Sequence, residues 1–261
     1  MGRPPQDKQD SSGRNTLIGL SFMLWTVAIG CSTDDGREAV DVYAASSLAD
    51  IMNLVEEGYE NDNPEVDIRM NLAGTNALVR QINSGANASI VVAADTSFLD
   101  DLVEPPAAPP VPLAINELTL VVPDDNPAGI VSPTDLDLDG VLTARCATGV
   151  PCGDATDDYL ADNGLTIARA TDEANVRSVL AKVSTGEVDA GFVYQTDAAA
   201  TDTVINLPLD DAPQVTVTMA RLSDDNAAIV LADYLGSDEV AAMFNQLGFG
   251  PPGGVGHGDD G

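Results

Sequence analysis

Basic residues are scarce in this 261-residue sequence. Lys and Arg together number 11, whereas Asp and Glu number 42, so the formal net charge at pH 7 is −31. Proteins that bind nucleic acids neutralise phosphates with Lys and Arg, and the composition therefore excludes nucleic acid as a partner. We interpret the excess of carboxylates as a heavily solvated surface rather than as a binding site.

Histidine is almost absent. The only one, His257, lies in a C-terminal tail at residues 251–261 that we predict to be disordered. A Ser-His-Asp or Cys-His catalytic arrangement therefore cannot form in the folded part of the chain. The nucleophile-elbow, Walker A and dinucleotide-binding motifs are also missing. Carboxylates are so numerous that their spacing nominates no glycosidase pair, and we do not expect an enzyme.

Apolar runs of membrane-spanning length are missing as well. The run "LIGLSFMLWTVAIG" at residues 17–30 is too short for a span, which needs about 20 residues. Basic residues precede it and Cys31 follows it, a pattern that predicts a signal peptide at residues 1–30. Because "AIGC" resembles a bacterial lipobox, we expect Cys31 to carry a lipid, with residues 31–38 as a tether. A plain signal peptide or an uncleaved anchor is the alternative.

The other two cysteines of the sequence, Cys146 and Cys152, lie in "CATGVPCG". In an exported protein an even pair of cysteines is most simply a disulfide, which here closes a small loop. Two thiolates without a nearby histidine would hold a metal ion poorly. We therefore predict a disulfide and no metal site.

The first half of the folded region alternates strands with helices. Strands are predicted at residues 39–45, 66–72 and 89–95, and apolar residues at helical spacing lie between them. This rhythm is typical of a parallel sheet covered by helices.

A second α/β unit follows the Pro-rich break at residues 104–112. Strands are predicted over 113–123, 141–147, 188–194 and 204–209, with helices over 154–164 and 173–186. The alternating segment 214–222 could return the chain to the first unit. Residues 227–249 then continue with helical periodicity.

The acidic segment "DLDLDG" at residues 135–140 matches the start of a calcium-binding loop. The twelfth position of such a loop should be a bidentate Glu, but it is Cys146. An acidic surface loop is the favoured interpretation, with a calcium site as the alternative.

Neutral polar residues gather where predicted strands end. Ser46 and Ser47 follow the first strand, Thr75 and Asn76 precede the second helix, and Tyr194 ends the strand at 188–194. In open α/β sheets such strand ends surround one crevice, where ligands bind. Together they would direct hydroxyls and helix N-termini at one point without Lys or Arg, which suits a small anion. A hydroxyl at the first of these helix starts would either cap the helix or help to hold that anion.

From Val40 to Phe249 the chain resembles the molybdate-binding proteins of bacterial ABC importers. The resemblance rests on "VYAASSLAD", "LAGTNALVRQINSGANASIVVAAD", "VPCGDATDDYL", "EANVRSVLAKVSTGEVDAGFVYQTDA" and "YLGSDEVAAMFNQLGF", in this order and spacing. It implies a two-lobed type II periplasmic-binding-protein fold, in which each lobe is a mostly parallel sheet flanked by helices and the ligand lies in the cleft. Lobe I would comprise residues 39–118 and 217–250, and lobe II residues 119–216.

The same resemblance implies the ligand donors and the partners. Ser47, Thr75 and Tyr194 would donate from hydroxyls, and Cys152 and Val176 from backbone N–H groups, with Ser46 and Asn76 as weaker candidates. Ser47 would then both cap its helix and donate to the anion. The protein would be an exported monomer, anchored by Cys31 to the outer face of the membrane, that delivers molybdate or tungstate to a permease. Molybdenum would be present only within the bound oxyanion, and no cofactor is implied. Sulfate or another tetrahedral oxyanion, and a secreted acidic calcium-dependent module or hydrolase, are the alternatives.

Overall fold

The computed structural model of the protein describes residue 2 and residues 36–253. Apart from residue 2, the predicted signal peptide lies outside these residues, as do Cys31, most of the tether and the tail beyond residue 253. None of the helices between residues 36 and 253 combines the length and the apolarity that crossing a membrane requires.

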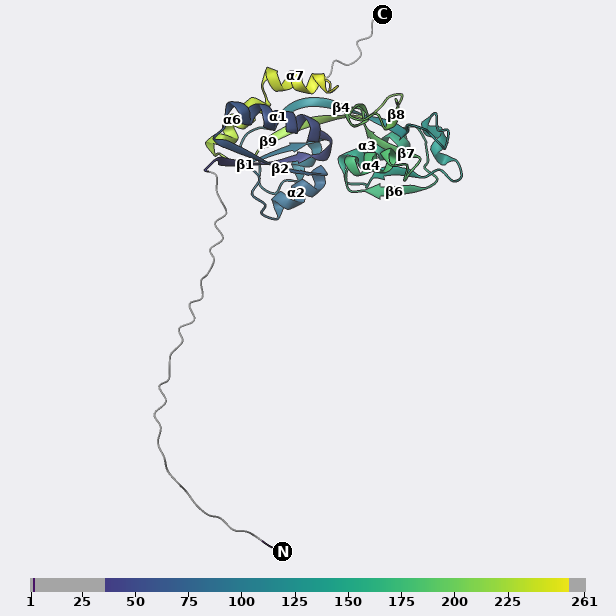
Figure 1. Cartoon of the computed structure of the whole chain (residues 1–261), viewed down its shortest axis with the longest axis horizontal. Helices are drawn as coiled ribbons and strands as arrows, with labels where there is room; N and C mark the ends of the chain where they lie inside the picture. Colours follow the sequence, from purple (N-terminus) through teal and green to yellow (C-terminus); the bar gives the residue numbers. More distant parts are fainter. Residues whose placement is uncertain (1, 3–35, 254–261) are drawn as a thin grey trace, which may run out of the picture. The chain divides into compact units, whose positions relative to one another are not determined.

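Two strands pass between the predicted lobes and organise the sheet. β4 (Val111–Pro123) pairs antiparallel with β9 (Gln214–Arg221) as far as Glu117. Beyond Glu117, β4 pairs instead with β7 (Ala190–Tyr194) and β8 (Val204–Leu207). The strand order is β2-β1-β3-β9-β4-β7-β5-β6, with β8 beside β4 (Figure 1). The first half of β4 therefore belongs to the sheet of lobe I and the second half to that of lobe II.

Lobe I contains the strand–helix alternation that the sequence predicts. β1 pairs in parallel with β2 and β3, and β3 pairs antiparallel with the returning β9. The helical spacing of Ile51, Val55 and Tyr59 buries one face of α1. Short 3₁₀ helices are labelled η, and the elements are β1 (Glu38–Ala45), η1 (Ser46–Leu48), α1 (Ala49–Asp62), β2 (Val66–Ala73), α2 (Thr75–Asn83), β3 (Ile90–Ala93), η2 (Thr96–Asp101), α6 (Asn226–Leu235) and α7 (Asp238–Gln246).

Lobe II repeats the arrangement around the second half of β4. β5 pairs in parallel with β6 and β7, while β4 pairs antiparallel with β7 and β8. Its remaining elements are η3 (Pro133–Asp137), β5 (Thr143–Cys146), α3 (Pro151–Asp162), β6 (Ala170–Glu173), α4 (Val176–Ser184) and α5 (Gln195–Ala199).

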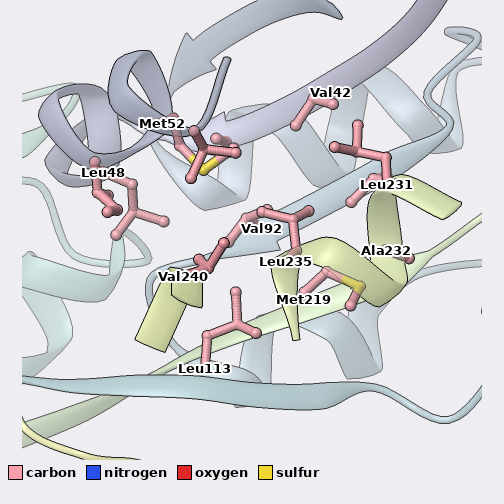
Figure 2. Close-up of a cluster of buried hydrophobic side chains, with 14 of the residues drawn as sticks. Val42, Leu48, Met52, Val92, Leu113, Met219, Leu231, Ala232, Leu235 and Val240 are labelled. Atoms are coloured by element: carbon pink, nitrogen blue, oxygen red, sulfur yellow. The ribbon is translucent and has the colours of Figure 1, made fainter. Parts of the chain in front are cut away.

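Each lobe has its own hydrophobic core. In lobe I, side chains of α1, α6 and α7 pack on those of the strands, as Figure 2 shows for Met52, Leu231 and Val240. The core cluster changes between Ala114 and Leu118 on β4. The residues from Gly36 onward nevertheless form one unit by their contacts, so the lobe boundaries stay a prediction.

The structure differs from the predicted elements in three places. β6 was not predicted because "ATDE" has no apolar alternation, and it lies at the exposed sheet edge. The five-residue α5 was too short to show a period. The predicted helical stretch at 227–249 forms two helices, because α6 stops at Gly236 and the Ser237 hydroxyl accepts the Val240 N–H to begin α7.

The acidic segment at residues 135–140 contributes a cap to η3. The Asp135 carboxylate accepts the N–H groups of Val131 and Ser132, at 2.9 and 3.0 Å. It forms a capping box with Ser132 at the start of this helix. These bonds give Asp135 a local structural role at the start of this helix.

Candidate functional site

A small cavity lies where four helix starts and the end of β7 come together. The predicted donors that line it are Ser46, Ser47, Thr75, Cys152, Val176 and Tyr194. It leaves about 10 Å³ open to the centre of a water molecule, about the room that one water requires. Of the predicted candidates with described positions, Asn76 alone lies elsewhere, in a neighbouring pocket of about 400 Å³. Its Oδ1 accepts the Ala77 N–H at 2.8 Å.

The serine turn of lobe I presents two hydroxyls to this cavity. Ser46 and Ser47 are 8% and 5% exposed, and within the described part of the chain neither hydroxyl forms a hydrogen bond. The expectation that Ser47 caps the helix is wrong, because neither η1 nor α1 has a side-chain cap. The helix begins with the 3₁₀ turn Ser46–Leu48, so Ser47 lies inside the first turn rather than at the N-cap position.

Thr75 supplies the second donor of lobe I. It is the first residue of α2 and is 1% exposed. Its Oγ1 accepts the Ala94 N–H at 3.1 Å, and this leaves the hydroxyl hydrogen free to donate. The N–H of Thr75, as the first residue of α2, has no acceptor within its own helix.

In lobe II the predicted donors are first-turn backbone N–H groups of α3 and α4. The N–H groups of Gly153 and Asp154 bond to the Val150 carbonyl, whereas that of Cys152 has no intrahelical acceptor. At α4, the Asn175 side chain accepts the Ser178 N–H at 3.0 Å and leaves the Val176 N–H available. Asn175 also lines the cavity, although sequence analysis did not select it.

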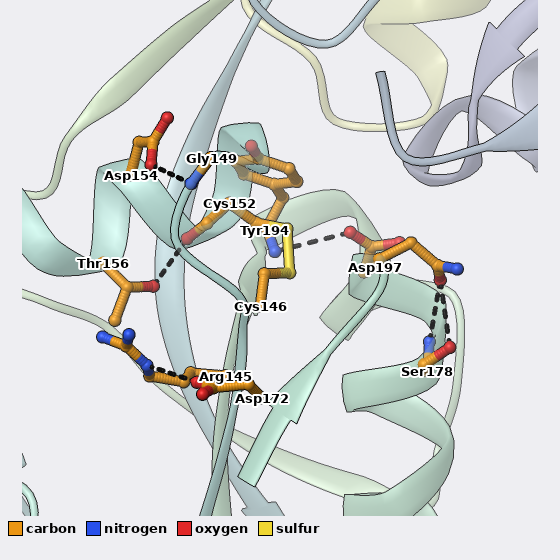
Figure 3. The surroundings of a disulfide bond; sticks show 11 residues. Arg145, Cys146, Gly149, Cys152, Asp154, Thr156, Asp172, Ser178, Tyr194 and Asp197 are labelled. Atoms are coloured by element: carbon orange, nitrogen blue, oxygen red, sulfur yellow. Dashed lines mark hydrogen bonds and ion pairs between the residues drawn. A yellow bond between two sulfur atoms is a disulfide. The ribbon is translucent and has the colours of Figure 1, made fainter. Parts of the chain in front are cut away.

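A disulfide fixes the loop that leads to Cys152. Cys146 ends β5 and Cys152 lies in the first turn of α3, and the bond joins them with their Cα atoms 5.7 Å apart (Figure 3). Gly153 tightens the same turn, because a Cβ there would lie 2.1 Å from the Ala147 carbonyl oxygen. The disulfide and the close approach of Gly153 to Ala147 therefore both fix the position of the Cys152 N–H.

Tyr194 contributes a buried phenol. Its side chain is 1% exposed, and its hydroxyl has no hydrogen-bond partner in the part of the chain that the structure describes. Burial, and next the nearby Asp197 carboxylate, raise the pKa of Tyr194 well above its ordinary value. The phenol therefore stays neutral and can donate to an anion.

The side chain of Asp197 contacts the backbone of Tyr194. Its Oδ2 accepts the Tyr194 N–H at 3.4 Å, as Figure 3 shows, and its Oδ1 lies 2.9 Å from the Arg177 Nε, although these two atoms are not aligned for a hydrogen bond. The carboxylate is fully buried, and burial raises the pKa of Asp197 to about 7, while the Arg177 guanidinium acts in the opposite direction. An acid three residues after a helix start is a capping-box signal that could have identified Asp197 in the sequence.

Within residues 36–253, no charged side chain lines the cavity. Arg177, next to Val176, pairs with Asp50 and Asp197, and Arg80 lies in the neighbouring pocket with Asn76. The site therefore offers hydroxyls and backbone N–H groups, which together can hold a small anion through neutral dipoles.

Comparisons with known proteins identify relatives of this chain. A family model described as bacterial extracellular solute-binding protein matches residues 40–250. The molybdate-binding protein ModA of Mycobacterium tuberculosis is 33% identical over 198 residues, covering 71% of this chain and 76% of that protein.

Two solved structures share the fold. The periplasmic molybdate-binding protein of Azotobacter vinelandii has a TM-score of 0.71 at 17% identity, covering 82% of this chain and 99% of that one. The sulfate-binding protein SubI of Mycobacterium tuberculosis also has a TM-score of 0.71, at 16% identity, covering 82% and 87%. The predicted type II periplasmic-binding-protein fold is confirmed.

The raised pKa of Asp197 predicts a pH dependence of folding. Between its ordinary value of 3.8 and about 7, the folded state holds a proton that the unfolded state releases. The contribution of Asp197 to stability is therefore greatest below this window and falls as the pH rises through it. Asn does not titrate. We therefore expect the free energy of unfolding of Asp197→Asn, minus that of the wild type, to be larger at pH 8 than at pH 5.

Urea unfolding of both proteins at pH 5 and pH 8 measures this difference. The other carboxylates are the same in both proteins, so their effect on stability cancels in the comparison. An equal difference at the two pH values would mean that Arg177 keeps Asp197 ionised in the folded state throughout the window.

Proposed function

The chain belongs to the bacterial extracellular solute-binding protein family, and we propose that it captures molybdate or tungstate for an ABC importer. It is a binding protein rather than an enzyme. One observation carries the proposal: the Tyr194 hydroxyl is buried without a partner in a cavity lined by further neutral donors. A buried polar group left unpaired costs about 1–3 kcal/mol, and an oxyanion would supply the missing acceptor.

The absence of charge in the cavity favours a fully ionised oxyanion as the ligand. Each oxygen of such an anion accepts hydrogen bonds, and bonds to a charged partner are stronger than neutral ones. Molybdate and tungstate share charge and nearly share size, so we propose both. The identity to a molybdate-binding relative over 71% of this chain supports this choice.

Sulfate is the second candidate, because neutral donors also suit that dianion. The fold does not separate the two, since it is shared with a sulfate-binding protein as well as with a molybdate-binding one. The spacing of the donors in the closed cleft would decide between them, through the size of the anion that they can surround.

We further propose how the protein reaches its place of action. Residues 1–30 would direct export, and Cys31 would carry the lipid that holds the protein on the outer face of the membrane. There it would act as a monomer and pass its ligand to the permease of the importer. The family description as extracellular supports this placement.

The ligand class is tested by calorimetric titration of the purified protein with molybdate, tungstate, sulfate and phosphate. We expect molybdate and tungstate to bind with similar affinity and much more tightly than the other two. If sulfate bound more tightly than molybdate, sulfate would become the proposed ligand. An absence of heat with all four anions would remove the oxyanion proposal.

Tyr194→Phe tests the donor that carries the proposal. A hydrogen bond to a charged partner contributes about 1.5–3 kcal/mol, so molybdate affinity should fall roughly 10- to 150-fold. The ligand-free variant should be at least as stable as the wild type, because the substitution removes a buried hydroxyl without a partner. Titration and thermal unfolding measure the two effects, and unchanged affinity would exclude Tyr194 as a donor.

Gly74 provides a separate test of cleft closure. Its backbone angles, φ −64° and ψ 139°, suit any residue, but a Cβ would lie 2.7 Å from the carbonyl oxygen of Ala174 in the other lobe. Gly74→Ala should therefore fold normally and yet be unable to close fully. We expect weaker molybdate binding and, by small-angle scattering with saturating molybdate, a larger radius of gyration than the wild type.

Gly236 offers the matched control, since a Cβ there would meet no atom closer than 3.7 Å. Gly236→Ala should bind and close as the wild type does. Equal closure of the Gly74→Ala protein would contradict the steric argument.

A further inference from the structure

Arg177 forms an ion-pair chain that crosses from one lobe to the other. Its Nη2 lies 2.5 Å from the Oδ2 of Asp50 on α1 of lobe I. Its Nε lies 2.9 Å from the Oδ1 of Asp197 on α5 of lobe II. Among the ion pairs of residues 36–253, the other basic partners bond to acids of their own lobe.

The two carboxylates differ in their surroundings. The Asp197 side chain is fully buried, whereas that of Asp50 is 48% exposed. Arg177 is thus anchored within lobe II by a buried partner and reaches outward to a surface partner. Separation of the lobes would break only the bond to Asp50, and both groups could then be hydrated at little cost.

The chain also connects elements that present the proposed donors. Asp50 lies three residues after Ser47, and Arg177 follows Val176 directly. Asp197 accepts the backbone N–H of Tyr194. α4 and η1 are in contact, so the bridge lies beside the cavity without lining it.

We propose that the Asp50–Arg177 ion pair is a latch that holds the cleft closed over its ligand, with Asp197 positioning the guanidinium. The inference rests on the proposed function, because a latch matters only to a receptor that closes. A bond present in the closed state and absent from the open state shifts the equilibrium toward closure. Arg suits this role since its charged, planar group can pair with Asp197 while another of its N–H groups donates to Asp50.

The latch predicts an effect on the dissociation rate. In the Asp50→Asn variant the closed state loses one exposed ion pair, and we expect molybdate to dissociate about two- to five-fold faster. A purely electrostatic role predicts the opposite sign, because removing a carboxylate near the cavity lessens the repulsion of the anion. The direction of the change therefore separates the two explanations.

Asp224→Asn is the matched control. Asp224 pairs with Arg221 at 2.7 Å within lobe I, so the substitution removes one charge and one surface ion pair without touching the contact between lobes. Its dissociation rate should equal that of the wild type. The ligand-free melting temperature of Asp50→Asn should also be unchanged, which a merely structural role of Asp50 would not allow.

Dissociation is measured with the full chain at pH 8 by stopped-flow tyrosine fluorescence, after dilution of the molybdate complex. Faster release from Asp50→Asn, with partial recovery in Asp50→Glu, supports the latch. Release at the wild-type rate or slower overturns it while leaving the proposed function intact. Failure of the wild type to bind any oxyanion would instead remove the proposed function and the latch with it.

Discussion

The structure depends on one constraint: a site without charged side chains can hold an anion only if many weak dipoles point at the same place. A single first-turn N–H contributes little, because the partial charges of a helix start act over a short range. Thr75, Cys152 and Val176 can act together in the proposed site because three helices begin around one cavity. In α/β sheets this convergence follows from the topology, since helices begin just beyond the carboxyl ends of parallel strands.

The acidic surface favours neutral donors over a basic residue in the cavity. With a net charge of −31, the protein surrounds itself with a field that repels dianions, and water and salt screen that field over about 10 Å. A single basic residue in the cavity would be attracted to the many carboxylates nearby, as Arg177 is to Asp50 and Asp197. Neutral donors are not neutralised in this way, so the proposed anion would have no carboxylate as a competitor.

Much of this arrangement could be predicted from the sequence, and the remainder shows what a linear pattern leaves out. Strong local signals identified β1, α1, β2, α2 and β3 because their apolar periods are regular. The resemblance then named donors that the structure brings to one cavity. Gly74 could not be predicted, since its importance comes from Ala174, 100 residues away in the sequence and close to it in space.

The helix starts show the same limit at a finer scale. Ser47 was expected to be a cap because it is a serine before an apolar helix, yet an added 3₁₀ turn moves it inside the first turn. Asn76 is adjacent to Thr75 in the sequence, but its side chain turns to the Ala77 N–H and lines another pocket. One residue of displacement on a helix rotates a side chain by about 100°, so a pattern can locate a donor turn more easily than the donating side chain.

The two walls of the cavity differ in rigidity, and this difference bears on how size would be recognised. The disulfide and the close approach of Gly153 to Ala147 fix the Cys152 wall. The lobe I wall meets it through the contact of Gly74 with Ala174 and through the Asp50–Arg177 pair.

An anion that is too large would keep Gly74 away from Ala174 and prevent the ion pair from forming. An anion that is too small would leave buried donors such as Tyr194 unpaired, which costs free energy in the closed state. Selection by size would therefore be decided by closure, and the contacts outside the cavity would determine selectivity as much as the donors within it.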